Sequence, residues 1–207
     1  MSSFLQWDGE FLLWIQENLR LDALTPFMKA ITVLGNAGVF WLILTALMLF
    51  IPKTRRAAFA SAVAMVFVFI TCNLITKNLV NRIRPYEVVE GLERLVAKPV
   101  DASFPSGHTA ISFGSAVALF FYLNRKFGIG LLVLASVIAW SRLYVGVHYP
   151  TDVLGGLVFG IVMGALGHLA ADRLWPLLER KFGNSAKSEP LTNENEVPDR
   201  SDRSDMA

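Results

Sequence analysis

The sequence has little charge and almost no cysteine. Of its 207 residues, 17% are charged and 54% are hydrophobic, and the formal net charge is +2. Such a near-neutral chain lacks the broad basic field that binds nucleic acid. Its single cysteine, Cys72, excludes an intramolecular disulfide. The composition is too apolar for an ordinary soluble domain and fits one helical bundle in a membrane.

Signals of two other kinds are missing as well. The N-terminus has no basic start, short apolar core and small-residue cleavage site, so no cleaved signal peptide is expected. No group of cysteine and histidine residues has zinc-binding spacing, and the carboxylates do not form a metal cage. We therefore expect a site without metal or cofactor, in a chain that is targeted by its own membrane segments.

Long apolar runs predict five membrane-spanning helices. Each run is close to the ~17–25 residues that cross ~30 Å of hydrocarbon, and lipid offers no partner for a free amide, so each must be helical. The predicted spans are residues 34–51, 57–76, 107–123, 128–144 and 152–175. The expected fold class is thus all-α, an integral membrane bundle of five transmembrane helices, or six if the N-terminal region also crosses.

Two regions flank the transmembrane domain predicted at residues 34–175. In residues 1–33, aromatic and aliphatic side chains recur at helical spacing between charged ones, which favours interfacial helices anchored by Trp7 and Trp14. A sixth span is the alternative for this region. Residues 183–207 are polar and lack aromatic residues, so we expect a disordered cytoplasmic tail.

Alternation of the five spans assigns the connecting segments to two sides. The short turns at residues 53–56 and 124–126 are basic, which places them in the cytoplasm. The 78–104 loop and the 145–151 connection then face the extracytoplasmic side of a bacterial inner membrane, although the longer loop also carries Lys and Arg.

Three polar motifs meet at the extracytoplasmic ends of these apolar segments. They are Lys77-(six residues)-Arg84-Pro85, Pro105-Ser106-Gly107-His108, and Ser141-Arg142-(five residues)-His148-(three residues)-Asp152. Polar groups are expensive at such positions in a membrane, and are functional candidates by default.

The second motif predicts a helix start that binds anions. Pro105 and Ser106 directly precede an apolar run, so Ser106 is expected to cap the helix. Its free N–H groups and positive pole attract phosphate, and Gly107 lets a ligand approach the backbone. Taken alone, the motif is equally typical of an ordinary capped helix with a stray histidine.

The basic residues of the other two motifs suit a transferring phosphoryl group. Arg142, with Lys77 or Arg84, supplies fixed positive charge and fork-shaped donors for phosphate oxygens. Arg82, in contrast, is expected only to extend toward lipid headgroups.

The third motif predicts a nucleophile. His148 and Asp152 are four residues apart and share one helix face. A carboxylate bonded to one ring nitrogen fixes the tautomer and leaves the other nitrogen free to attack phosphorus. His108 is then the expected general acid for the leaving group, and His168, deep in the last span, is expected to be a packing or hydrogen-bonding residue. The alternative is a His–Asp cap at the start of that span.

Small residues recur every four positions in the last and third spans. Gly156, Gly160 and Gly164 continue the face that begins at Asp152, and small residues at this spacing let helices approach closely in lipid. We expect internal packing that holds Asp152 rigid, rather than dimerisation.

Together, the three motifs resemble the signature of the type 2 phosphatidic acid phosphatase superfamily, which includes lipid phosphatases and vanadium-dependent haloperoxidases. The resemblance implies that His148 carries a phosphohistidine intermediate supported by Asp152, and that His108 protonates the leaving group. It implies that the phosphate oxygens are held by Lys77, Arg84, Ser106, Gly107 and Arg142. Residues 101–110 are also similar to bacterial undecaprenyl-diphosphatases of the bacitracin-resistance type, many of which have aspartate where this chain has Gly107.

The sequence therefore predicts a membrane lipid phosphatase. Its expected substrate is an isoprenoid diphosphate, such as undecaprenyl diphosphate, or a glycerophospholipid phosphate. The alternatives are a haloperoxidase that holds vanadate in the same pocket, and a non-catalytic lipid-phosphate binder or flippase. The expected partners are the lipid substrate and membrane lipids, with no nucleic acid.

Overall fold

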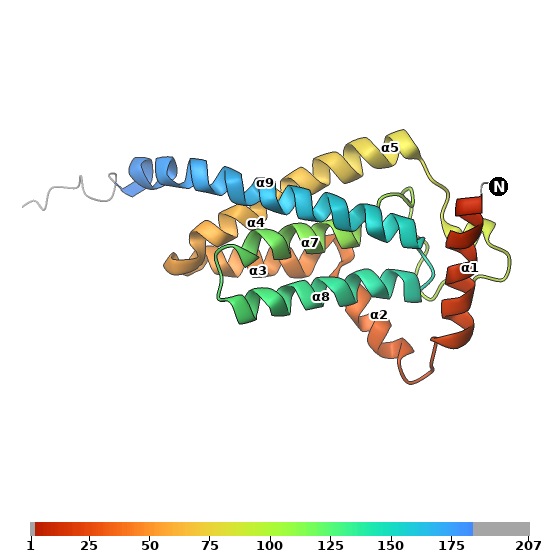
Figure 1. Cartoon of the computed structure of the whole chain (residues 1–207). Coiled ribbons are helices and arrows are strands. Elements are labelled where there is room, and N and C mark those ends of the chain that lie inside the picture. The colour runs from red at the N-terminus through yellow and green to blue at the C-terminus, as the bar shows by residue number, and fades with distance from the viewer. Residues whose placement is uncertain (1–2, 184–207) are drawn as a thin grey trace, which may run out of the picture. The chain divides into compact units, whose positions relative to one another are not determined.

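The computed structural model describes residues 3–183, which form helices and connecting loops without a strand (Figure 1). The principal helices, in chain order, are α1 (Ser3–Asn18), α2 (Thr25–Leu34), α3 (Val39–Phe50), α4 (Arg55–Val68), α7 (Gly107–Phe120), α8 (Arg125–Tyr144) and α9 (Pro150–Gly183). Shorter pieces connect them: η1 (Asn36–Gly38), η2 (Pro52–Thr54), η3 (Phe69–Thr76), α5 (Lys77–Val80) and α6 (Pro85–Val88). The chain divides into two compact units, Met1–Trp175 and Pro176–Ala207. The tail predicted at 183–207 lies, beyond Gly183, outside the described residues.

The described helices support a membrane bundle with fewer clear spans than the sequence predicted. Three stretches are long and apolar enough to cross a membrane, Pro52–Val88, Arg125–Tyr144 and Pro150–Arg180. α2 and α3 make a fourth candidate only when their bent pair is counted as one span. The span predicted at 107–123 is α7, which has 14 residues and falls short of the usual length. Five or six spans are therefore not confirmed.

A break interrupts the first predicted span. α2 and η1–α3 meet at an angle of 47° around Gly35. Ala37 (φ 49°) and Gly38 (φ 68°) both have left-handed backbone conformations, which end a right-handed helix. A side chain at position 35 would place its Cβ 2.5 Å from Cδ2 of His108. The break thus lets the backbone approach a predicted site residue closely.

Glycines join α9 to α7 beneath the site. A Cβ at Gly156 would lie 2.6 Å from the carbonyl oxygen of Ser106, and one at Gly160 would lie 2.8 Å from that of Ala110. At Gly164 the corresponding contact, with the Gly114 oxygen, is 2.7 Å. Since real side chains do not tolerate such distances, these small residues permit the helix contact, as the sequence spacing predicted.

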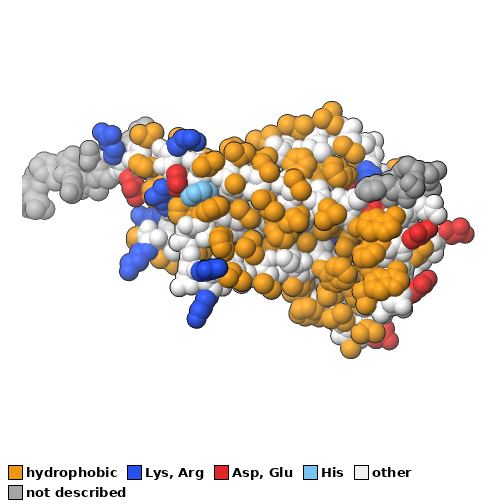
Figure 2. Space-filling model, viewed as in Figure 1, with side chains coloured by type: hydrophobic (Ala, Val, Ile, Leu, Met, Phe, Trp, Pro, Cys, Tyr) orange, Lys and Arg blue, Asp and Glu red, His pale blue; other side chains and the backbone are white. Residues whose placement is uncertain are grey.

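Many apolar side chains of α3, α8 and α9 point outward, for instance Leu47, Val133 and Val158. Figure 2 shows hydrophobic side chains across the middle of the visible face, with Lys and Arg near the α3–α4 and α7–α8 turns and Asp and Glu near α1. An apolar zone between two charged ends is the surface that a lipid bilayer requires.

The N-terminal helix α1 has two different faces. Trp7, Phe11 and Trp14 stack along one side, with ring centroids 5.7 Å and 5.9 Å apart, and both tryptophans are about half exposed. The opposite side buries Leu12 and Ile15 in the protein. The amphipathic helix expected here is present, and its inner face packs beside the site.

Candidate active site

The three motifs surround one cavity of about 500 Å³. Each motif stands at a helix end: Lys77 begins α5, Ser106 caps α7, and Arg142 lies in the last turn of α8. Of the eight predicted site residues, those that line the cavity are Lys77, Arg84, Gly107, His108, Arg142 and His148. Its size is typical of a small-ligand site.

A π-helical segment precedes Lys77. η3 (Phe69–Thr76) has the wider π-helical turn, and Thr76 donates a hydrogen bond of 2.7 Å to the carbonyl oxygen of Thr71 within it. Such turns insert a residue into a helix and are frequent at functional sites. Lys77 emerges from this segment almost fully buried, with 6% of its surface exposed.

Lys77 and Arg84 share a carboxylate that motif reasoning did not single out. The Nη2 atom of Arg84 lies 2.7 Å from Oδ1 of Asp101, and Lys77 donates to the other oxygen of the same carboxylate. Burial alone would raise the pKa of Asp101, but the hydrogen bonds and charges of Lys77 and Arg84 lower it to about 2. Asp101 is therefore an anion at neutral pH. Its carboxylate is bonded to Lys77 and Arg84, two of the cations that a phosphate would use.

The start of α7 has a buried cap. Ser106 is fully buried, and its hydroxyl accepts hydrogen bonds from the backbone N–H and the hydroxyl of Thr109. Its backbone N–H donates to the carbonyl oxygen of Asp152, which joins α7 to α9. Unlike Gly107, whose added Cβ would lie 3.6 Å from Nζ of Lys77, Ser106 does not line the cavity.

His148 lies in the connection between α8 and α9 with its two nitrogens in different surroundings. Nδ1 is 3.4 Å from Oδ2 of Asp152, and Nε2 is 3.4 Å from Nη1 of Arg84 at the cavity. Because a guanidinium can only donate, Nε2 is the nitrogen with the free electron pair. Burial lowers the pKa of His148 to about 4, and the charges of Arg84 and Arg142 act in the same direction.

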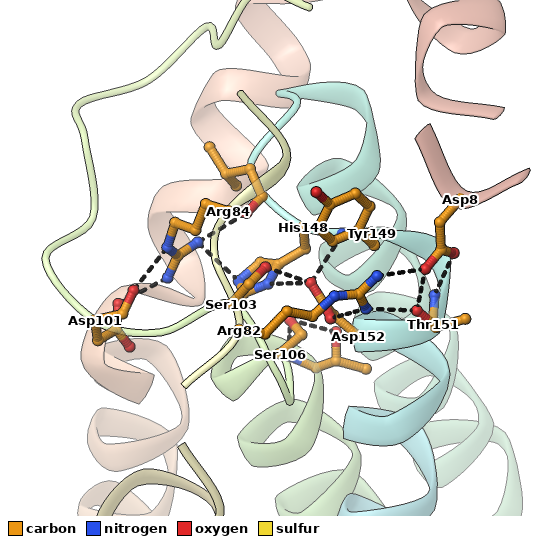
Figure 3. A network of polar contacts seen from close by, with 12 residues as sticks. Asp8, Arg82, Arg84, Asp101, Ser103, Ser106, His148, Tyr149, Thr151 and Asp152 are labelled. Atoms are coloured by element: carbon orange, nitrogen blue, oxygen red, sulfur yellow. Dashed lines mark hydrogen bonds and ion pairs between the residues drawn. The ribbon is translucent and has the colours of Figure 1, made fainter. Parts of the chain in front are cut away.

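A buried network holds Asp152 behind this histidine (Figure 3). Asp152 accepts a hydrogen bond of 2.9 Å from the backbone N–H of Tyr149, and another from the hydroxyl of Ser103. Arg82 donates to Asp152 at 2.7 Å and, through its other nitrogen, to Asp8 of α1 at the same distance. Asp8 and Asp152 are both fully buried.

The expectation that Arg82 only extends toward headgroups is wrong. Its side chain is 16% exposed, ion-paired to two carboxylates, and placed 3.9 Å over the ring of Tyr149. The reason is the α1 helix, which brings Asp8 to a position 74 residues away in sequence. Nothing in the spacing around Arg82 indicated that partner.

Two residues from the α2–α3 break were also missed. Arg142 donates from Nη1 to the hydroxyl of Thr32. His108 places Nε2 2.9 Å from Oδ1 of Asn36. Thr32 lies in the last turn of α2 and Asn36 opens η1, and both line the cavity. The two sides of the break thus supply partners to two of the predicted site residues.

His168 belongs to a separate cluster on α9. Its Nδ1 atom is 2.9 Å from the hydroxyl of Tyr122, and its ring stacks on Phe121 with centroids 4.1 Å apart. It does not line the cavity, which agrees with the expectation of a packing or hydrogen-bonding residue. Within residues 3–183, no group of three or more His, Cys, Asp or Glu side chains is arranged to hold a metal ion.

Comparison with known proteins decides the family. Residues 55–176, more than half of the chain, match the model of the PAP2 superfamily. The chain belongs to this superfamily. A curated relative, the undecaprenyl-diphosphatase BcrC of Bacillus subtilis, is 32% identical over 162 residues, covering 78% of this chain and 81% of the relative. The resemblance deduced from the motifs is confirmed, and the chain is a membrane lipid phosphatase, a hydrolase.

Two solved structures share the fold. A transmembrane PAP2-type phosphatidylglycerolphosphate phosphatase from Bacillus subtilis has a TM-score of 0.67 and 24% identity, with 92% of this chain and 90% of that chain covered. A bacterial vanadium-dependent iodoperoxidase is more distant, with a TM-score of 0.62, 19% identity, and 80% and 48% of the two chains covered. At these identities, both likenesses concern the fold alone.

Proposed function

We propose that this protein hydrolyses a polyprenyl diphosphate, with undecaprenyl diphosphate as the first candidate, through a phosphohistidine on His148. The observation that carries the proposal is the position of the His148 ring, between Asp152 and the cation Arg84 at the wall of the cavity. The name of the relative BcrC supports the choice of substrate. Glycine at position 107 is common in the wider superfamily. A glycerophospholipid phosphate is therefore the alternative substrate to test against the diphosphate.

The first step forms a bond between Nε2 of His148 and the terminal phosphorus. As the bond from phosphorus to the leaving oxygen breaks, His108 gives that oxygen a proton. Asp152 keeps the Nδ1 proton of His148 in place and stabilises the positive charge that develops on the ring. Lys77, Arg84 and Arg142 surround the phosphate oxygens with positive charge, which stabilises the transition state.

The second step releases the phosphate. His108, now neutral, takes a proton from water as the water oxygen attacks phosphorus, and the bond to Nε2 breaks. In both steps the first N–H groups of α7, at Gly107 and the residue after it, face the phosphate as free donors. Ser106, buried behind the cavity wall, accepts two hydrogen bonds from Thr109 through its oxygen and so fixes the start of α7.

A site at the end of the apolar zone suits a lipid substrate, because its tail stays in the bilayer while its headgroup meets the cations. We place this end on the extracytoplasmic side of a bacterial inner membrane, since the basic α3–α4 and α7–α8 turns lie at the other end of the bundle (Figure 2). In this arrangement α7 is the third of five spans, and the residues that flank it complete the length that the membrane requires. Residues 1–33 form an interfacial region, residues 34–175 the phosphatase domain, and residues 183–207 a cytoplasmic tail.

The test is phosphate release by the detergent-solubilised protein from undecaprenyl diphosphate, phosphatidate and phosphatidylglycerophosphate, each with and without a chelator. We expect the diphosphate to be hydrolysed fastest and the chelator to have no effect. Preference for either glycerophospholipid would overturn the substrate assignment, and a strict need for a divalent metal would overturn the cation-only mechanism. Halide oxidation with added vanadate, exceeding phosphate release, would favour the haloperoxidase alternative.

Leaving groups offer a second test of the mechanism. A phosphate leaving group needs less help from a proton than an alkoxide does. His108→Ala should therefore slow diphosphate hydrolysis less than hydrolysis of phosphatidate. Equal losses on the two substrates would remove His108 from the role of acid.

A further inference from the structure

The two histidines of the site have partners of opposite kinds. His148 has a carboxylate, Asp152, at 3.4 Å from Nδ1, and His108 has a neutral amide, Asn36, at 2.9 Å from Nε2. The partners therefore select opposite tautomers. His148 keeps its proton on Nδ1 and attacks with Nε2, whereas His108 keeps a proton on Nε2 and has Nδ1 for proton transfer.

The difference between a carboxylate and an amide fits the different tasks. A carboxylate makes its histidine more basic, which favours a nucleophile whose ring becomes positively charged during attack. An amide oxygen orients a ring through a hydrogen bond without adding a negative charge. An acid with such a partner releases its proton more readily, because no carboxylate is bonded to the ring to hold the imidazolium.

We infer that Asn36 is a positioning residue, which orients His108 so that Nδ1 protonates the leaving oxygen. This inference rests on the proposed function. When the bond from phosphorus to the leaving oxygen breaks, the proton on Nδ1 moves to that oxygen and the proton on Nε2 stays with the amide of Asn36. The neutral ring then has the tautomer that takes a proton from water in the second step.

The backbone around Asn36 is shaped for this contact. Asn36 opens η1, where the helix bends by 47°, and the adjacent Gly35 leaves room for the His108 ring, which a Cβ would meet at 2.5 Å. Asn36 itself is exposed, so its amide contributes little to the core. A loss of activity on its replacement is therefore separable from a loss of folding.

The surroundings of His108 are mainly cationic. The titratable or charged groups that act on it or line the same cavity are Arg142 of α8, His148 of the α8–α9 connection, Lys77 of α5, Arg84 before α6, Lys29 of α2, and Lys98 and Asp101 of the following loop. A carboxylate at position 36 would thus add a close negative charge to a positive environment. Such a charge would favour the imidazolium form of His108.

The experiment compares Asn36→Ala and Asn36→Asp with the wild type on two monoesters, p-nitrophenyl phosphate and phosphatidate in detergent micelles. The aryloxide leaves without a proton, whereas the glycerol oxygen of phosphatidate needs one. We expect Asn36→Ala to lower kcat on phosphatidate about 10-fold or more, and to change kcat on p-nitrophenyl phosphate less than about 2-fold. Asn18→Ala, an exposed asparagine bonded only within α1, is the matched control and should behave as the wild type.

The pH profile separates orientation from structural support. Asn36→Asp should move the basic limb of kcat on phosphatidate to higher pH by about one unit, because His108 then keeps its proton longer. Equal losses on both monoesters, wild-type kinetics of Asn36→Ala, or an unmoved basic limb in Asn36→Asp would each overturn the inference. A wild-type protein that releases phosphate from no substrate would instead overturn the proposed function.

Discussion

The two sides of the cavity differ in how deeply the partners of their histidines are buried. On the His148 side, Asp152 and Asp8 are fully buried and Arg82 joins them, so a chain of charged contacts runs from α9 to α1. On the His108 side, the partner Asn36 is exposed and Asp101 is half exposed. We call the first side the rigid half and the second the open half. In the proposed mechanism the rigid half forms the bond to phosphorus and the open half receives the leaving group.

The largest effect should come from the rigid half. His148→Ala should lower phosphate release by about 10⁴-fold or more, as loss of a nucleophile does in other hydrolases. His168→Ala is the matched control, because this histidine lies outside the cavity, and it should retain most activity. A His148→Ala protein that keeps its rate of phosphate release would contradict this role of His148. A wild-type protein that binds lipid phosphate but releases no phosphate would favour the non-catalytic alternative.

Replacing Arg82 tests how much the charged network of the rigid half contributes to the stability of the protein. Arg82→Gln leaves two buried carboxylates without their cation, which should lower the free energy of unfolding by about 3–5 kcal/mol. Arg56→Gln breaks an exposed Arg–Asp pair, with side chains 42% and 40% exposed, and should cost about 1 kcal/mol or less. Unfolding in detergent, followed for both variants, tests the difference. Similar costs would show that the Asp8–Arg82–Asp152 network contributes no special stability.

The site residues were predicted from the sequence much better than the residues that hold them in place. All eight predicted site residues lie at one end of the bundle, because each motif stands where an apolar helix begins or ends, and such positions are readable from hydropathy. Asp8, Thr32 and Asn36 escaped notice, since each reaches the site from a segment that looks interfacial or merely apolar. Their partners are between 70 and 110 residues away in sequence.

The break in the first span was equally hidden, although a signal for it exists. Residues 35–38 contain two glycines and an asparagine, all of which favour left-handed or turn conformations. A long apolar run on either side concealed this signal. The short α7 was hidden for a related reason, because hydropathy continues past Phe120 where the helix stops.

The pH at which the His148 ring takes up a proton tests whether the rigid half excludes water. Its pKa is lowered to about 4 from the usual ~6.5, so the ring should stay neutral and nucleophilic as the pH falls through 6.5. A titration of histidine ring signals by NMR, with His148→Asn used for assignment, should show this ring unchanged down to about pH 5. A midpoint near 6.5 would show that the ring is solvated.

The smallest effect should come from the open half. In the proposed mechanism Asp101 competes with phosphate for Lys77 and Arg84, and a half-exposed ion pair is worth about 0.2–1 kcal/mol. Asp101→Asn should therefore tighten inhibition by inorganic phosphate by about 2- to 5-fold. Glu87→Gln, which removes the exposed partner of Lys98, should leave the inhibition constant unchanged. Weaker inhibition in Asp101→Asn would mean that Asp101 orients the two cations instead of competing for them.

The covalent intermediate provides the most direct measurement. Protein mixed with substrate and quenched in alkali within one turnover should carry phosphate on the peptide that contains residue 148, as detected by mass spectrometry, and His148→Asn should carry none. Phosphate on a different residue, or its complete absence under conditions where product is formed in a burst, would contradict attack by this ring.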